Sequence, residues 1–403
     1  MALQLFQNPH VTQAGYSTGS AAPEAFHRRL PGYAPTPLGA APLLAAELGL
    51  GQIWVKQESC RLGMPAFKIL GASWATYRAL ERRLGAPLDG WATLEELRAK
   101  LAVLHPLTLA AATDGNHGRA VARMAALLGF GARILVPYGT AQARIDAIAS
   151  EGAQVIIVDG SYDDAVALSA REAGQDCLVI SDTAWDGYEQ VPRDVIDGYD
   201  TIFAEADAQL AGLGVATPTL LLIQMGVGAL AAAAVRHYRS RERMPDQLQI
   251  VGVEPDTAAC VLAAMRAGQI VEVPGPHPSI MAGLNAGLAS PVAWPDLQRG
   301  IDLFLAVPDD LARQAMRLLA AYGITAGETG AASIAGLIAL MTEPSWVEAR
   351  AALELGPHTQ VLVVVSEGAT DPGAYEQIVG RPPHYRCENP DGCTCRSGIG
   401  RLR

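Results

Sequence analysis

The feature that most constrains the fold is an alternation of short apolar stretches with helical patterns along most of the chain. The apolar stretches have the length and the Val, Ile and Leu content of buried strands. We predict such strands at 107–112, 133–136, 154–158, 177–180, 219–224, 248–254 and 360–365, after an alternating strand at 52–58. Strands that alternate with helices form a mainly parallel sheet that is covered by helices on both faces. The sequence therefore predicts an α/β protein.

Length and composition predict two lobes. The chain has 403 residues, half of them hydrophobic, which is enough to bury a large core. We expect a discontinuous larger domain from residues 1–81 and 214–380, a smaller inserted domain at 82–213, and a tail at 381–403. The tail carries Cys387, Cys393 and Cys395, but their spacing is a poor match to a zinc site, so we expect no metal there.

Composition also limits the partners and the location of the protein. The net charge of −11 argues against a nucleic-acid partner, because phosphate binding needs clustered Lys and Arg. The chain lacks an apolar run of about 18 residues, so we expect no membrane span. The first residues lack the pattern of a secretory signal. These features predict a cytoplasmic enzyme that acts on a small molecule.

Lys68 is the first candidate for chemistry. It lies among apolar and small residues just before a helical pattern, so it is either a surface lysine or a buried amine. A buried amine with a lowered pKa readily forms a Schiff base. A pyridoxal 5'-phosphate (PLP) enzyme needs such a lysine, a phosphate cradle, a partner for the pyridine nitrogen and a polar group on the ring oxygen. The chain offers a candidate for each.

The candidates lie where predicted strands end, which is where open α/β sheets bind ligands. The turn of Gly226, Val227, Gly228, Ala229 and Leu230 joins a strand to a helix, so its N–H groups suit a phosphate. A close-packed turn is the alternative interpretation of this turn. It lacks the G-x-G-x-x-G spacing of a dinucleotide site.

A second loop combines Thr113, Asp114, Gly115, Asn116 and His117. Four polar residues around a glycine at a strand end favour a binding loop, although a turn with a helix cap is also consistent.

Ser366 ends the last apolar strand, and its hydroxyl either caps a turn or bonds a pyridine nitrogen. A hydroxyl cannot keep that nitrogen protonated as a carboxylate would. Such a site favours elimination over transamination.

Several motifs together resemble the fold-type II, or tryptophan synthase β-like, PLP enzymes. Asp114-Gly115-Asn116-His117-Gly118 is similar to the Ser-Gly-Asn-His loop of serine and threonine dehydratases, with aspartate in place of serine. The chain more closely resembles the diaminopropionate ammonia-lyase family. That resemblance rests on residues 63–71, 112–119, 182–188, 280–285, 328–330 and 366–371. It implies two lobes, each with a mainly parallel twisted sheet flanked by helices.

The resemblance also implies roles around the cofactor. Lys68 would hold PLP and act as the base on the L-isomer of the substrate, with Phe67 beside it. Asn116 would bond the ring hydroxyl, Gly226 to Leu230 would hold the phosphate, and Ser366 would face the pyridine nitrogen.

On the substrate side, the resemblance implies that Asp114 and Asp182 are the active-site aspartates, with Asp182 linked to proton removal from the D-isomer. Thr113, Gly115 and His117 would complete the substrate site. For Asp182, a helix cap or a turn is the alternative role. The family is homodimeric and converts 2,3-diaminopropionate to pyruvate and two ammonia molecules.

Other functions stay open at this point. An aspartate such as Asp114 suits the second ammonium of diaminopropionate, which argues against a plain serine or threonine dehydratase. It does not exclude a β-replacement enzyme of specialised amino-acid metabolism. A PLP-fold protein that binds an amino acid without turnover is a further alternative. The sequence does not give the D or L preference or any requirement for a monovalent cation.

Overall fold

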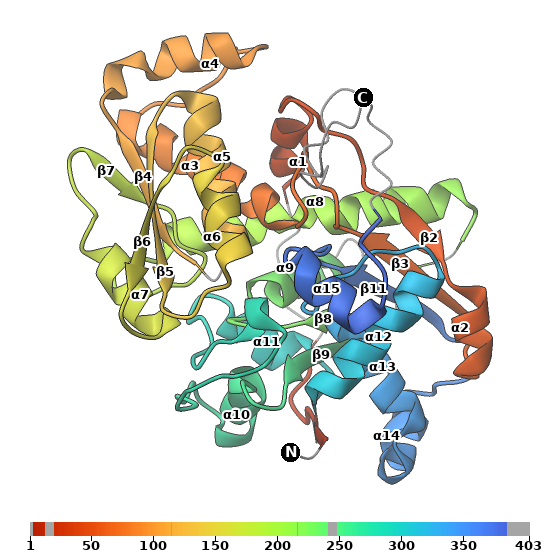
Figure 1. Cartoon of the computed structure of the whole chain (residues 1–403). Coiled ribbons are helices and arrows are strands. Elements are labelled where there is room, and N and C mark those ends of the chain that lie inside the picture. The colour runs from red at the N-terminus through yellow and green to blue at the C-terminus, as the bar shows by residue number, and fades with distance from the viewer. Residues whose placement is uncertain (1–2, 13–19, 114, 216, 241–247, 385–403) are drawn as a thin grey trace, which may run out of the picture.

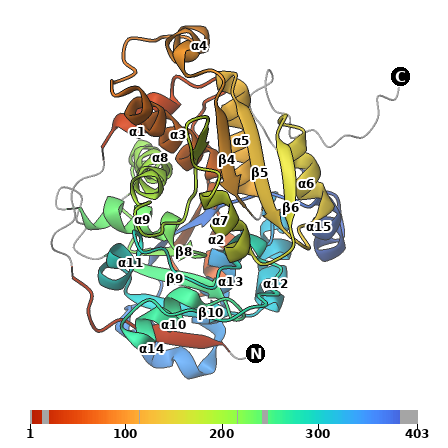
Figure 2. The ribbon, with the colours of Figure 1, turned by 90° about the vertical axis from the view of Figure 1, so that its left-hand side faces the viewer.

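The strands of the chain form two sheets, one at each end of the molecule (Figure 1). The computed structural model describes residues 3–12, 20–113, 115–215, 217–240 and 248–384. Figure 2 shows the same two sheets after a quarter turn, with α8 seen nearly along its axis beside α3.

The larger sheet has seven strands in the order β1-β10-β9-β8-β11-β3-β2. The strands are β1 (Gln4–Gln7), β2 (Leu38–Ala40), β3 (Gln52–Gln57), β8 (Leu220–Gln224), β9 (Gln249–Pro255), β10 (Leu303–Val307) and β11 (Gln360–Val365). The five inner strands are parallel, while β1 and β2 pair antiparallel at the two edges. The inner strands β8, β9, β10 and β11 are almost wholly buried, as expected for a sheet with helices on both faces.

The smaller sheet is entirely parallel, in the order β6-β5-β4-β7. Its strands are β4 (Thr108–Ala112), β5 (Gly131–Pro137), β6 (Gln154–Val158) and β7 (Cys177–Val179). These strands fall inside the segment 82–213, for which the sequence predicts a separate domain. The domain boundaries themselves stay a prediction.

Helices account for most of the remaining described structure. They are α1 (Ala22–His27), α2 (Pro42–Glu47), α3 (Lys68–Leu84), α4 (Leu94–Leu101), α5 (Asn116–Leu128), α6 (Gln142–Ala149), α7 (Tyr162–Ala170), α8 (Gln190–Gly212), α9 (Ala229–Arg239), α10 (Cys260–Ala267), α11 (Trp294–Gly300), α12 (Asp309–Ala321), α13 (Ala332–Thr342), α14 (Val347–Ala352) and α15 (Pro372–Val379). Three single 3₁₀ turns are η1 (Ala102–Leu104), η2 (Ala282–Leu284) and η3 (Pro344–Trp346).

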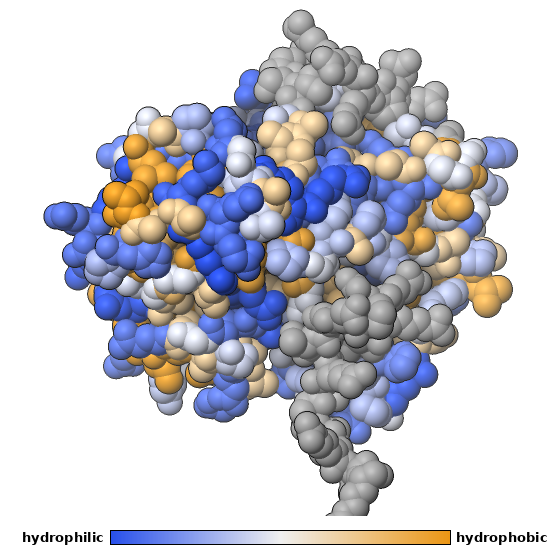
Figure 3. Space-filling model, turned by 90° about the horizontal axis from the view of Figure 1, so that it is seen from above, coloured by the Kyte–Doolittle hydropathy of each residue, from blue (hydrophilic) through white to orange (hydrophobic). Residues whose placement is uncertain are grey.

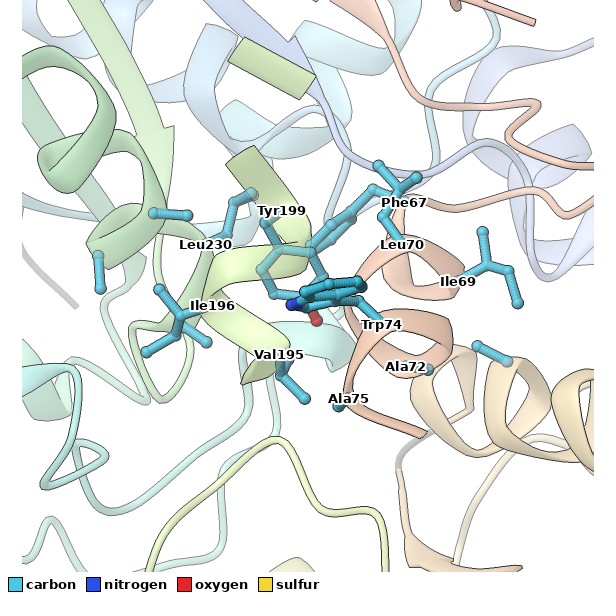
Figure 4. Packing of buried hydrophobic residues seen from close by; sticks show 14 of the residues in the cluster. Phe67, Ile69, Leu70, Ala72, Trp74, Ala75, Val195, Ile196, Tyr199 and Leu230 are labelled. Atoms are coloured by element: carbon cyan, nitrogen blue, oxygen red, sulfur yellow. The ribbon is translucent and has the colours of Figure 1, made fainter. Parts of the chain in front are cut away.

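Helices α3, α8 and α9 connect the two sheets through one continuous apolar core. The α3–α8 crossing is close because a glycine lies on each helix. A Cβ on Gly198 would come within 2.7 Å of the Leu70 carbonyl oxygen and 2.8 Å of the Gly71 Cα. Figure 4 shows the aromatic rings that fill the adjacent space, where Phe67 meets Tyr199 edge-on with ring centroids 4.6 Å apart.

The other face of the larger sheet is covered by a second core, which includes α12 and α13. Helix α13 is apolar almost all round and wholly buried up to its last two residues, as a helix inside a large core should be. In the part of the chain that the structure describes, no helix is long and apolar enough to cross a membrane. The surface in Figure 3 mixes hydrophilic and hydrophobic residues.

The structure has a strand at or near each of the eight predicted positions, but it also has three strands that the sequence analysis missed. Strands β1 and β2 are short edge strands of four and three residues, too short to show a period. Strand β10 is a buried run of five residues that comes directly after α11. It completes the larger sheet beside β9.

Candidate active site

One pocket gathers the loops that follow the strands of both sheets. Its walls come from the start of α3, the start of α5, the loop after β7, the turn before α9, the segment around η2 and the loop after β11. The lining residues are Phe67, Lys68, Asn116, Tyr162, Asp182, Gln224, Gly226 to Leu230, Ala282 to Ala286, Thr329, Ser366 and Glu367. The carboxyl ends of the strands therefore build this site, as open α/β sheets predict.

Lys68 is the first residue of α3, and its amine reaches into the pocket. The loop before it is pinned to the loop after β11, because Phe67 N donates to Ser366 O at 3.2 Å and Gly368 N donates to Pro65 O at 2.8 Å. These two backbone hydrogen bonds hold the segment before Lys68 against the loop after β11, which fixes the position of the lysine.

A buried ion cluster anchors the start of the same loop. The guanidinium of Arg61 donates to Glu58 at 2.7 Å and to Glu205 at 2.6 Å, and Lys56 donates to Glu205 at 2.8 Å. All four side chains are buried. Burial alone would raise the pKa of Glu205, but Arg61 and Lys56 lower it to about 2. The cluster ties β3 and the loop before α3 to α8.

Asp182 is the counter-ion of Lys68. The Lys68 Nζ donates to Asp182 Oδ2 at 2.5 Å, and the Tyr162 hydroxyl donates to Oδ1 at 3.3 Å. Burial favours a neutral carboxyl, but the charge of Lys68, with His117 nearby, holds the pKa of Asp182 well below its usual range. The structure therefore brings these two predicted site residues into direct contact.

The loop before α5 places Asn116 and His117 differently. Asn116 lines the pocket. The His117 side chain is buried, with Nε2 donating to Ile180 O at 2.7 Å and Nδ1 lying 3.9 Å from Asp182 Oδ2. Thr113 closes the turn, because its hydroxyl oxygen accepts from the backbone N–H of Gly115 and of Gly118.

Thr113, Gly115 and His117 do not line the pocket in the described part of the chain, so their substrate roles stay predictions. Asp114 lies outside the described residues.

The glycine turn between β8 and α9 has the geometry of an anion cradle. Gly228 has a φ of +99°, which a side chain disfavours, and a Cβ there would meet Leu297 Cδ1 at 2.4 Å. A Cβ on Gly226 would come within 3.1 Å of the Gly283 carbonyl oxygen. Helix α9 starts at Ala229 without a side-chain cap, so its first N–H groups face the pocket side of the turn.

Ser366 is buried at the end of β11 and lines the pocket. Among the described residues, its hydroxyl oxygen finds no hydrogen-bond partner. An orphaned buried hydroxyl costs free energy unless a ligand satisfies it, so its presence in a pocket wall indicates a ligand.

Comparison with known proteins assigns the pocket to a family. The family described as pyridoxal-phosphate dependent enzyme matches residues 29–367. The chain belongs to this family. Within it, the diaminopropionate ammonia-lyase of Escherichia coli (strain K12) is 39% identical over 365 residues, 89% of this chain and 90% of the relative. This PLP-dependent enzyme therefore also belongs to the diaminopropionate ammonia-lyase family, which confirms the resemblance drawn from the sequence.

Crystal structures of relatives support the same family assignment. A crystal structure of the E. coli enzyme, in complex with an aminoacrylate-PLP azomethine reaction intermediate, matches with a TM-score of 0.85 and 35% identity over 94% of this chain and 97% of that one. The E. coli enzyme in complex with D-serine matches with a TM-score of 0.86 and 36% identity over the same shares. The predicted fold class, the fold-type II PLP enzymes, is confirmed.

The pocket of this PLP-dependent enzyme suits its cofactor. Lys68 would supply the amine, the turn from Gly226 to Leu230 would supply uncapped N–H groups for the phosphate, and the orphaned Ser366 hydroxyl would supply a partner for the ring nitrogen. Asn116 supplies an amide at the side of the pocket. These donors match the set that the cofactor needs.

Sequence reasoning missed five polar residues of the pocket wall, which are Tyr162, Gln224, Asn285, Thr329 and Glu367. Tyr162 begins α7 directly after β6, so its place at a strand end is the signal that could have found it. Glu367 directly follows Ser366, and an acidic residue at the end of an all-apolar strand was its signal.

Proposed function

We propose that this chain catalyses the PLP-dependent α,β-elimination of ammonia from 2,3-diaminopropionate, which gives pyruvate and ammonia. The observation that carries the proposal is the direct contact between Lys68 and the buried carboxylate of Asp182 in the pocket. The relatives that match most of the chain are named diaminopropionate ammonia-lyases, which supports the substrate.

PLP, when bound, supplies an electron sink that stabilises negative charge on the substrate Cα. Lys68 removes the Cα proton from the L-isomer, and Asp182 removes it from the D-isomer. While Lys68 carries its charge, it keeps the pKa of Asp182 low. Once Lys68 loses that charge, burial dominates and raises the pKa of Asp182 toward that of a useful base.

Two polar residues, Ser366 and Asp114, determine which reaction the site favours. The Ser366 hydroxyl cannot keep a ring nitrogen protonated, so the site favours loss of a leaving group over a long-lived carbanion. Asp114 meets the β-ammonium of the substrate through a charge-assisted hydrogen bond and assists its departure. Thr113, Gly115 and His117 belong to the same loop as Asp114 and complete the proposed substrate site.

A serine or threonine dehydratase and a β-replacement enzyme are the competing functions. Purified, PLP-loaded protein is mixed with the D- and L-isomers of diaminopropionate and of serine, and with L-threonine. Pyruvate or 2-oxobutyrate is measured together with ammonia. Two ammonia per pyruvate from diaminopropionate supports the proposal. Turnover of serine or threonine alone refutes it in favour of a dehydratase, and spectral change without keto acid refutes it in favour of β-replacement.

We also propose that the chain forms a homodimer and acts in the cytoplasm. Tyr138 and Ile157 support a contact between copies, because these apolar side chains are 77% and 56% exposed, one directly after β5 and one on the neighbouring β6. Light scattering on the eluted peak of a sizing column tests the dimer, and cell fractionation tests the location.

A further inference from the structure

Glu367 is a buried carboxylate in the pocket wall that the mechanism above does not use. It is 1% exposed, and both of its oxygens are hydrogen-bonded. Oε2 accepts from the side-chain Nδ2 of Asn116 in a short contact, and Oε1 accepts from Thr329 N at 3.2 Å. Gly327 N donates to the Glu367 carbonyl oxygen at 3.0 Å, so backbone and side chain are both fixed.

A carboxylate can only accept hydrogen bonds, so it dictates which end of an amide faces it. The Asn116 amide nitrogen must therefore point at Glu367, and its carbonyl oxygen must point away. The same nitrogen carries a second hydrogen. Because Asn116 lines the pocket, this second N–H can donate a hydrogen bond to an acceptor inside it.

We propose that Glu367 is a positioning residue that fixes the orientation of the Asn116 amide, so that the amide presents an N–H donor to the cofactor's ring oxygen. The proposal rests on the proposed function in so far as it assigns Asn116 to that oxygen. It adds a residue that acts through Asn116, by determining which way the Asn116 amide is turned.

A second carboxyl group, Glu328, supports this role. It is buried in the loop that wraps around Glu367, and in the described part of the chain its Oε2 has no hydrogen-bond partner. The charged groups that face it are Glu367, Arg144 of α6 and Asp371 at the start of α15. Burial, and then the charge of Glu367, raise the pKa of Glu328 to about 7.

Like charges repel, so a negative charge on Glu328 would act against the Glu367 carboxylate that holds Asn116. When Glu328 loses its proton at higher pH, the repulsion disturbs Glu367 and its hold on the amide. The orientation of Asn116 is therefore linked to the protonation of Glu328.

The test is a double-mutant cycle on the PLP-loaded enzyme with Glu367→Gln, Asn116→Ala and the double variant. A glutamine can donate as well as accept, so it no longer dictates the amide orientation. We expect E367Q to shift the visible absorption band of the bound cofactor and to lower kcat/KM for diaminopropionate about tenfold or more. The double variant should be no worse than N116A alone. Glu376→Gln, on the exposed face of α15, is the matched control and should leave the spectrum unchanged.

Losses that multiply in the double variant would overturn the proposal, as would a wild-type spectrum in E367Q. The spectrum needs no substrate, so the proposal is testable even if diaminopropionate is not turned over, which is the separate failure of the proposed function. If E367Q does not fold, the Glu328→Gln variant provides the test instead. Wild type should show a spectral step near pH 7 that E328Q lacks, and a step that persists in E328Q would refute the linkage.

Discussion

Replacing Gly198 with alanine tests whether the α3–α8 crossing positions Lys68. In a helix interior, Gly→Ala normally stabilises by about 0.5–1 kcal/mol, because glycine loses more conformational freedom on folding. At Gly198 the new Cβ would lie 2.7 Å from Leu70 O and 2.8 Å from Gly71 Cα. Both are backbone atoms, so neither can move aside by a side-chain rotation.

The expected change in the free energy of unfolding is the difference between the gain in helix propensity and the cost of the close backbone contacts. Overpacking that forces backbone shifts costs about 1–3 kcal/mol, which exceeds the gain in helix propensity. We therefore expect Gly198→Ala to lower the free energy of unfolding by about 1–2 kcal/mol. Because α3 begins at Lys68, only three residues before Gly71, a separation of the two helices also moves the reactive amine. We expect weaker retention of PLP as well.

Gly212→Ala is the matched control, because Gly212 lies on the same helix and a Cβ added there would have nothing within 4 Å. Urea unfolding, followed by far-UV circular dichroism, gives the midpoint for each variant, and absorbance gives the PLP content. G212A should unfold at the wild-type midpoint or above it, and G198A clearly below it. A G198A midpoint equal to that of G212A would refute the close crossing.

Three further predictions follow. Lys68→Ala should abolish the visible absorption of the bound cofactor and reduce turnover at least ~10²-fold in a pyruvate assay; retained turnover would remove its role. Asp182→Asn should lower kcat for D-diaminopropionate about 10²-fold and lower it less for the L-isomer, as kinetics on each isomer would show. Burial lowers the pKa of His27 from 6.5 to about 3, so folding excludes a proton that the unfolded chain binds. The free energy of unfolding should thus fall by about 1.4 kcal/mol per pH unit from pH 6.5 toward pH 3, and His27→Gln should lessen that slope in urea titrations at several pH values.

The fold was predictable at most of the strands that are buried on both faces, with β10 as the exception. Strand β11 reads as a continuous apolar run, because helices cover both sides of the larger sheet. Edge strands carry no such signal. Strand β1 pairs with β10, which lies at the far end of the sequence, and no local pattern specifies that partner.

The sequence predicted which loops form the candidate site, but it did not predict which side chains contact one another. Lys68 and Ser366 follow strands of the larger sheet, and Asn116 and Asp182 follow strands of the smaller one. The sheet rule places each pair at one edge of its sheet, but it does not bring the two pairs together. Glu367 was missed because its role depends on a partner in another loop. Its position at the end of an apolar strand indicated a site residue, but it did not indicate the contact with Asn116.

Both polar contacts that define the pocket join an element of one sheet to an element of the other. Lys68 follows β3 of the larger sheet and bonds Asp182, which follows β7 of the smaller sheet. Asn116 follows β4 of the smaller sheet and bonds Glu367, which follows β11 of the larger sheet. A movement of the two sheets relative to each other would therefore break both contacts together. The placement of the amine, its counter-ion and the oriented amide therefore depends on how the two sheets are packed against each other.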